Sequence, residues 1–212
     1  MKKSILISIQ PQHVKNILSG KKTMELRKSV PKDFKGWVYI YCTKSKPYLH
    51  RTEKDILKVY PNTERFILND DPMVAGFDIL NGHVVARFCF NNFITLQKDE
   101  AFDIYGDFYG TDTEDKFYFG QDILSDSCIE FKDLNTYWMN GKLFALNIKK
   151  LEVFDKTMEL SDFYSFGSQD HHDFITTSKM IEEDERECWI KSCRLKKAPQ
   201  SWMYVYTNEQ LP

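Results

Sequence analysis

The 212-residue sequence predicts an α+β fold in which a mixed β-barrel carries short helices and long insertions. Phe, Trp and Tyr make up 15% of the residues, and many stand in runs where apolar and polar side chains alternate, which favours strands. Apolar residues with helical spacing occur only in short segments. No repeat, low-complexity tract or clear linker divides the chain. We therefore expect one domain, residues 1–212, with insertions near residues 44–72, 97–128 and 163–193.

The strands expected to build the barrel have continuous or alternating apolar patterns bounded by turn signals. We expect them to form one curved, mostly closed sheet. In addition, Asn81-Gly82 predicts a hairpin turn between residues 76–80 and residues 83–90. The barrel strands are predicted at residues 5–9, 23–27, 37–41, 84–93 and 142–154.

Helices are predicted where apolar spacing and end signals agree. Residues 11–19 begin with Pro11, and Gly20 follows them as a C-cap. Residues 130–139 have helical apolar spacing, and residues 178–193 have the acidic start and basic end that suit the helix dipole. Further helices are expected at residues 52–59 and 160–166, whereas residues 97–127 show no clear period and are predicted to form an acidic, aromatic loop.

The composition favours a cytoplasmic protein with no membrane partner. No apolar stretch approaches the roughly 20 residues that a membrane-spanning helix needs. The first residues contain neither an apolar segment of signal-peptide length nor a small-residue cleavage site. Five cysteines without framework spacing are expected to be reduced.

The charge is unevenly distributed although the formal net charge is only −2. Residues 1–58 contain 14 Lys and Arg against 4 Asp and Glu, whereas residues 97–133 contain 3 against 11. A basic surface attracts phosphates without reading base sequence. The alternative is that the lysines only keep the surface soluble.

The most informative segment is Gly-Lys-Lys-Thr-Met-Glu-Leu-Arg at residues 20–27, which places mixed charges at a helix-to-strand junction. Side chains of a strand repeat every two residues, so Glu25 and Arg27 should project from the same face. Lys22 stands at the start of this strand. The alternative is an exposed ion pair on a sheet edge, which would contribute little.

The pattern Gly-x-Lys-x-x-Glu-x-Arg after a short helix resembles the signature of the ASCH domain family of the phage and bacterial type, a branch of the PUA-like superfamily. Residues 5–9, 36–43, 142–148 and 198–205 are similar to strands of that family. The resemblance covers roughly residues 1–45 well and those from about residue 84 onward more loosely. It implies a PUA-like barrel with a cleft over the charged residues and a role with RNA, nucleotides or modified nucleosides.

In a binding protein of this kind, Arg27 would contact a phosphate or a base edge, and Glu25 would accept a hydrogen bond from an exocyclic amine. Aromatic side chains such as Tyr41 and Trp202 would offer stacking faces for unpaired bases. The predicted ligand-binding residues are Lys22, Glu25, Arg27, Tyr41, Thr43, Gln200, Ser201 and Trp202.

A hydrolase is the alternative, with Lys22 as proton carrier. One ASCH lineage hydrolyses N4-acylated cytidine with a Lys at the position of Lys22 and a Thr at the position of Glu25, and a Glu cannot replace that hydroxyl as nucleophile. For its third catalytic residue, Asp126 and Glu130 are merely near in sequence. A ribonuclease would need only a Lys such as Lys22 and hydroxyl groups such as those of Tyr41 or Thr43. A second alternative is a protein-binding adaptor that uses the acidic loop 97–133.

Other candidate sites lack the spacing that their chemistry requires. Asp170-His171-His172-Asp173, with Cys188 and Cys193 further on, does not match a zinc motif. Phosphate-binding glycine loops are absent from the sequence as well. We therefore expect neither a metal nor a cofactor, and binding of RNA or a modified nucleoside is the favoured function.

Overall fold

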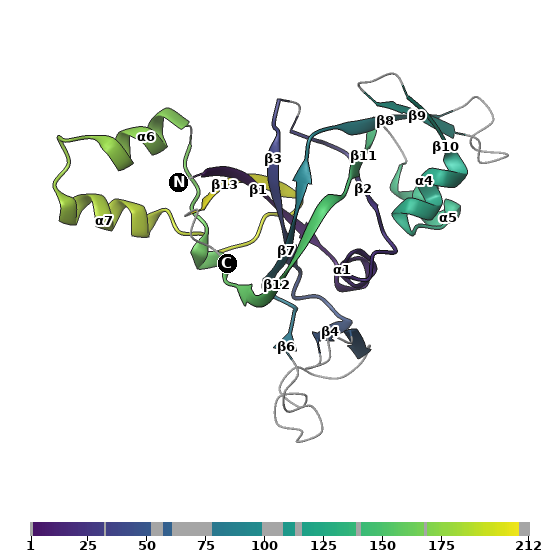
Figure 1. The fold of residues 1–212 in the computed structure, drawn as a ribbon, viewed down its shortest axis with the longest axis horizontal. Coiled ribbons are helices and arrows are strands. Elements are labelled where there is room, and N and C mark those ends of the chain that lie inside the picture. The colour runs from purple at the N-terminus through teal and green to yellow at the C-terminus, as the bar shows by residue number, and fades with distance from the viewer. Residues whose placement is uncertain are drawn as a thin grey trace. The chain divides into compact units, whose positions relative to one another are not determined.

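The computed structural model of the chain combines short helices with three β-sheets (Figure 1), so the predicted α+β class is confirmed. The chain divides into two compact units. Unit 1 contains Met1–Gln12, Trp37–Arg87 and Glu152–Pro212, and unit 2 contains His13–Gly36 and Phe88–Leu151. The structure describes residues 2–31, 33–51, 57–60, 78–98, 108–112, 116–138, 141–167 and 169–207. That the chain is one domain with insertions near 44–72, 97–128 and 163–193 stays a prediction.

The first five-stranded sheet has the order β12-β7-β3-β1-β13. Its strand β1 pairs in parallel with β3 and antiparallel with β13. Buried side chains that include Leu6, Tyr39 and Val205 form the adjoining core. The strands are β1 (Lys2–Ile9), β3 (Gly36–Cys42), β7 (Val84–Phe90), β12 (Lys149–Met158) and β13 (Trp202–Thr207).

Unit 1 also contains a small sheet with the order β5-β4-β6. The predicted hairpin around Asn81-Gly82 is wrong, because β6 pairs with β4 and not with β7. The physical reason is the Asn81 side chain, whose Oδ1 accepts from Leu49 N at 2.7 Å and whose Nδ2 donates to Ser45 O at 2.8 Å. These bonds tie the turn to β4. The three strands are β4 (Tyr48–Arg51), β5 (Leu57–Tyr60) and β6 (Asp78–Ile79).

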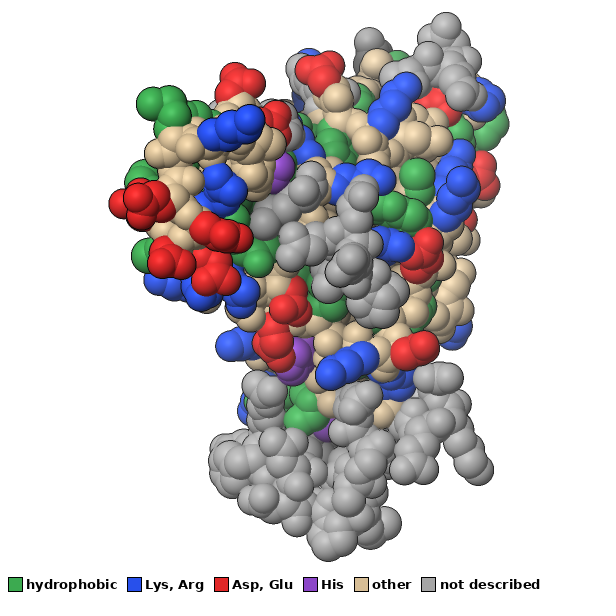
Figure 2. All heavy atoms as spheres, turned by 60° about the vertical axis from the view of Figure 1, so that its left-hand side comes forward, with side chains coloured by type: hydrophobic (Ala, Val, Ile, Leu, Met, Phe, Trp, Pro, Cys, Tyr) green, Lys and Arg blue, Asp and Glu red, His purple; other side chains and the backbone are tan. Residues whose placement is uncertain are grey.

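Helices α6 (Gln169–Thr177) and α7 (Glu183–Ser192) follow a short 3-10 helix at Leu160–Asp162. Ile175 of α6 is buried with three aromatic residues of unit 1, Tyr164, Phe166 and Tyr206. Helix α7 has the predicted acidic first turn and a basic last turn but begins later than expected. Figure 2 shows acidic and basic side chains close to one another on these helices.

Unit 2 is built on a second five-stranded sheet with the order β10-β9-β8-β11-β2. Before β2 lies α1 (Pro11–Leu18), the predicted first helix, which ends where Gly20 has a φ of 73°. Helices α4 (Gly120–Ser127) and α5 (Phe131–Tyr137) follow β10, and α5 confirms the helix predicted at 130–139. The strands are β2 (Met24–Arg27), β8 (Phe93–Lys98), β9 (Phe108–Asp112), β10 (Phe117–Phe119) and β11 (Leu143–Asn147).

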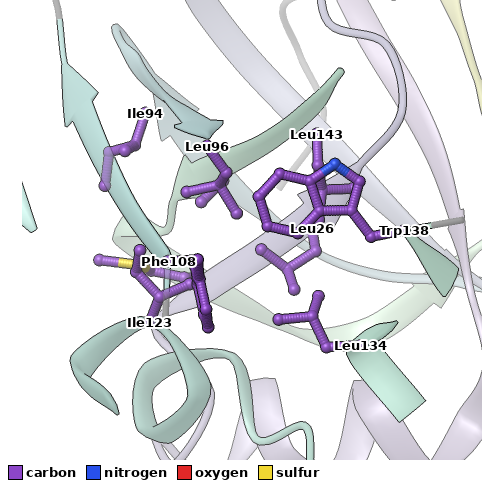
Figure 3. Close-up of a cluster of buried hydrophobic side chains, with 10 residues drawn as sticks. Leu26, Ile94, Leu96, Phe108, Ile123, Leu134, Trp138 and Leu143 are labelled. Atoms are coloured by element: carbon purple, nitrogen blue, oxygen red, sulfur yellow. The ribbon is translucent and has the colours of Figure 1, made fainter. Parts of the chain in front are cut away.

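One face of this second sheet packs against α4, α5 and Trp138 (Figure 3). Gly110 of β9 belongs to this face, where an added Cβ would lie 2.5 Å from Ile94 Cγ2. Such a close approach leaves no space for a side chain. The buried members of the cluster are Met24, Leu26, Ile94, Leu96, Phe108, Ile123, Leu134, Trp138, Leu143 and Ala145.

The prediction of one mostly closed sheet is wrong for the described residues, because the five predicted strands are divided between two sheets. Asn91 and Asn92 interrupt the predicted strand 84–93 between β7 and β8. The predicted strand 142–154 is interrupted at Ile148, and Lys150 adopts a positive φ of 51° that breaks the extended conformation.

The acidic loop predicted at 97–127 is also wrong in its described parts, which contain the end of β8, then β9, β10 and α4. In the first insertion, residues 57–59 of the predicted helix 52–59 belong to the strand β5, and residues 52–56 lie outside the described residues. None of the helices that the structure describes is long and apolar enough to cross a membrane.

Candidate functional site in unit 2

The link between α1 and β2 places Lys22 by main-chain hydrogen bonds. Lys22 N donates to Asn16 O of α1 at 2.9 Å, and Thr23 N donates to Asp126 O of α4 at 2.8 Å. The chain is therefore held on both sides of Lys22. This geometry fixes where the lysine side chain leaves the backbone.

Three charged side chains are buried next to one another, those of Lys22, Glu25 and Arg27. They are called the ion cluster. Lys22 Nζ lies 3.3 Å from Glu25 Oε2, and Arg27 Nη2 lies 3.0 Å from Glu25 Oε1. Only 5%, 9% and 11% of the Lys22, Glu25 and Arg27 side chains are exposed. Lys22 Nζ also donates to the main-chain oxygen of Ser127 at 2.6 Å. Both carboxylate oxygens of Glu25 are thus engaged by cations.

The ion cluster lies on the sheet face opposite the core. In the antiparallel pairing of β2 and β11, Arg27 is opposite Phe144 and Glu25 is opposite Leu146. Leu26 projects to the other face and joins the hydrophobic core. The predicted shared face of Glu25 and Arg27 is confirmed. Although β2 is an edge strand, the exposed ion pair considered as an alternative is wrong, because the side chains are buried.

His13 of α1 belongs to the same electrostatic environment, and sequence reasoning did not connect it with this cluster. Burial lowers the pKa of His13; the positive charge of Lys22 lowers it further, while Glu25 opposes the change. Among the described residues, its buried Nδ1 has no hydrogen-bond partner. One turn after His13, Asn16 accepts the hydrogen bond from Lys22 N, which is the local contact that brings α1 to the cluster.

Tyr137 at the end of α5 is a second residue that the sequence did not assign to the site. Burial raises the pKa of Tyr137, and Arg27 and Glu25 act on it with opposite signs. Lys28 Nζ lies 4.8 Å from the centre of its ring. In the sequence, this tyrosine stood out only as one apolar position of a helix. Its neighbours show that α5 brings a phenol close to the charged end of β2.

The lowered pKa of His13 predicts a pH dependence of stability. A histidine with a folded pKa below its unfolded value of about 6.5 contributes stability that is present above pH 6.5 and is lost as the pH falls through the folded pKa. The variant His13→Gln should therefore lose less stability than the natural protein between neutral and mildly acidic pH. Urea denaturation at several pH values measures this difference, with His171→Gln, at an exposed position of α6, as control. Equal pH profiles for the natural protein and His13→Gln would contradict it.

The other predicted ligand-binding residues belong to unit 1, whereas the ion cluster belongs to unit 2. Tyr41 is buried on β3, and Thr43 Oγ1 forms a hydrogen bond with Ser45 Oγ at 2.7 Å. Ser201 O accepts from Ser8 N at 2.9 Å, and Trp202 meets Tyr204 edge to face. That Tyr41, Thr43, Gln200, Ser201 and Trp202 share a site with the cluster stays a prediction.

Two acidic residues that lie near Ser127 in the sequence are Asp126 and Glu130. Asp126 contributes its main-chain oxygen to Thr23, and Glu130 is exposed at the start of α5. His172 lies in α6, with Nδ1 2.9 Å from Asp173 Oδ1 and its ring stacked on Tyr206 at 4.6 Å. These contacts give His172 a packing role.

No family model and no curated protein matches the sequence. Among solved structures, the chain is similar to the crystal structure of ASCH from Zymomonas mobilis, with 14% identity and a TM-score of 0.45, over 96% of this chain and 87% of that chain. Structures of two mutants of the same protein match at 15% and 14% identity with TM-scores of 0.40 and 0.45, over 97% and 96% of this chain and 91% and 88% of theirs. These structures are of an ASCH protein, and the motif at residues 20–27 resembles the signature of the ASCH domain family. At this similarity, residue roles rest on the geometry of this chain alone.

Proposed function

We propose that the protein binds RNA, or a nucleotide or modified nucleoside, through the ion cluster of a PUA-like fold. The observation that supports this most is the charge of the cluster. Lys22 and Arg27 supply two cations, whereas Glu25 supplies one carboxylate, and all three are buried. Two cations held close together on one carboxylate create a local positive potential, which attracts anions. A phosphate group has the matching charge.

Each side chain has a distinct part in this proposal. Arg27 presents a planar guanidinium, which matches a phosphate or the edge of a base better than an ammonium does. Glu25, held between two cations, orients Arg27 and can accept a hydrogen bond from an exocyclic amine. Lys22 adds positive charge from a position fixed by Ser127 O and Glu25.

Binding is favoured over hydrolysis by the contacts of Lys22. Its ammonium group already donates to a carbonyl oxygen and faces a carboxylate, which suits a fixed charge better than a group that exchanges protons with a substrate. In the related lineage that cleaves N4-acylated cytidine, the position of Glu25 holds a hydroxyl. Glu25 has no such hydroxyl, so hydrolysis is the less favoured alternative.

Fluorescence anisotropy with a labelled single-stranded RNA at low and high salt tests the proposal. We expect the affinity to fall as salt rises, because phosphate contacts release counterions. Arg27→Gln should weaken binding by about 5- to 150-fold, the range for loss of a specific charged contact. Lys35→Gln, which changes an exposed lysine of unit 2, should have only a small, salt-dependent effect.

Three outcomes separate the possibilities. Circular dichroism first establishes that each variant is folded. Unchanged affinity in folded Arg27→Gln, or no affinity for RNA, nucleotides and modified nucleosides, would refute the proposal. Hydrolysis of N4-acetylcytidine that is lost in Lys22→Gln would instead establish the enzyme.

A further inference from the structure

The face of the second sheet that holds the ion cluster continues across all five strands. Strand pairing places residues opposite one another in a single row from β2 to β10. Opposite residues of neighbouring strands share a face of the sheet. Four strand spacings of about 4.8 Å make this row about 19 Å long. The row consists of Arg27, Phe144, Thr95, Thr111 and Phe117.

The end of this face away from Arg27 is an exposed aromatic surface. Phe117 and Phe119 of β10 are 53% and 66% exposed. Tyr109 of β9 lies beside them, with its ring centre 5.2 Å from that of Phe117 and the two planes 18° apart. Phe117 meets Phe119 edge to face at 5.1 Å. These three residues are named here the aromatic platform, and exposed rings gathered in this way mark an interaction surface.

The hydroxyl of Tyr109 donates to Gln97 Oε1 at 3.0 Å, which fixes the ring relative to β8. Thr95 and Thr111 lie between the aromatic platform and the buried residues Arg27 and Phe144. Their side chains are neutral and able to form hydrogen bonds. An ordered, uncharged surface of this kind stacks bases without selecting among them.

The acidic residues of the described part of 97–133 do not belong to this exposed face. Asp112 lies on the core face, where its carboxylate accepts from Tyr118 Oη at 3.1 Å and from Lys116 N at 3.1 Å. Asp122 and Asp126 are on α4, Glu130 immediately precedes α5, and Asp133 is on α5. These helices pack against the core face. A basic protein partner would need carboxylates on the platform side. Among the residues that the structure describes, the distribution of charge therefore favours a nucleic acid on the platform side.

We propose that the aromatic platform stacks unpaired bases of a single-stranded RNA whose phosphate is held at Arg27. This inference rests on the proposed function and specifies its ligand as a chain of several nucleotides. Phe117 and Phe119 supply the stacking faces, and the row of Thr111, Thr95 and Phe144 connects them with the cation. Protein–RNA complexes commonly use aromatic side chains on a sheet in this way.

Two labelled probes test the inference, a uridine mononucleotide and a single-stranded oligouridine of about eight nucleotides, a typical binding-site size. Phe117→Ala and Phe119→Ala should each weaken oligouridine binding by about 5- to 150-fold, the range for loss of one stacked base, and leave the mononucleotide affinity unchanged. Phe174→Ala, which removes an exposed ring of α6, is the matched control.

The results distinguish this inference from the proposed function. If Arg27→Gln weakens both probes but Phe117→Ala and Phe119→Ala leave oligouridine binding unchanged, the platform is refuted and the proposed function survives. If neither probe binds the natural protein, both fail. If Phe117→Ala leaves RNA binding intact but abolishes a self-association seen by sedimentation, the surface is a protein interface and the inference is overturned.

Discussion

Glu25→Ala should lower the free energy of unfolding by about 3 to 5 kcal/mol, the usual cost of breaking a buried ion pair. Glu25 contacts Lys22 through one carboxylate oxygen and Arg27 through the other. Removing it leaves two buried cations close together without their shared carboxylate. Because the side chains are buried, salt should screen little of this loss. Urea denaturation followed by circular dichroism, at low and high salt, measures it.

An exposed ion pair of the same chain provides the matched control. Lys191 Nζ lies 3.1 Å from Glu187 Oε2 on α7, with 61% and 70% of the two side chains exposed. Glu187→Ala should change the free energy of unfolding by about 0.5 kcal/mol or less, because exposed pairs in helices contribute little. Equal losses for Glu25→Ala and Glu187→Ala would contradict the buried character of the cluster. The buried character of the cluster would also be contradicted if, at high salt, the loss of free energy of unfolding in Glu25→Ala fell to that in Glu187→Ala.

The charged core of the site could be predicted from the sequence because it depends on local geometry. Two-residue spacing places Glu25 and Arg27 on one face of any strand, and the link after α1 brings Lys22 to its start. His13 and Tyr137 were missed because they reach the cluster through the packing of α1 and α5. The spacing of residues along the chain contains no information about how these helices pack near the ion cluster.

The division into two sheets could not be predicted for a similar reason. Apolar residues resume directly after Asn91-Asn92 and continue at Ile148, although the strands of the structure end at these positions. Strands β9 and β10 were missed because they have five and three residues, too few to show a period within an acidic segment. Their side-chain alternation becomes visible only through pairing with β8.

Trp138→Ala should also be strongly destabilising, by about 3 to 5 kcal/mol, the usual cost of truncating a buried tryptophan. The side chain is buried in the core of unit 2, with its ring 5.8 Å from that of Phe108 in an edge-to-face contact. Its Nε1 donates to Gly141 O at 3.2 Å, so the substitution removes a hydrogen bond as well as packing. Urea denaturation should show the loss, whereas Trp189→Ala, on the exposed surface of α7, should change stability by about 0.5 kcal/mol at most.

The milder variant Trp138→Phe tests whether the two faces of the second sheet act independently, one on stability and the other on RNA affinity. It keeps an aromatic ring against the core face, where Leu26 packs, and does not touch the opposite face that holds Glu25 and Arg27. Folded Trp138→Phe should therefore be less stable than the natural protein and yet bind RNA with unchanged affinity. A matching loss of stability and affinity in this variant would show that the ion cluster depends on core packing, because the two faces of β2 would then respond together.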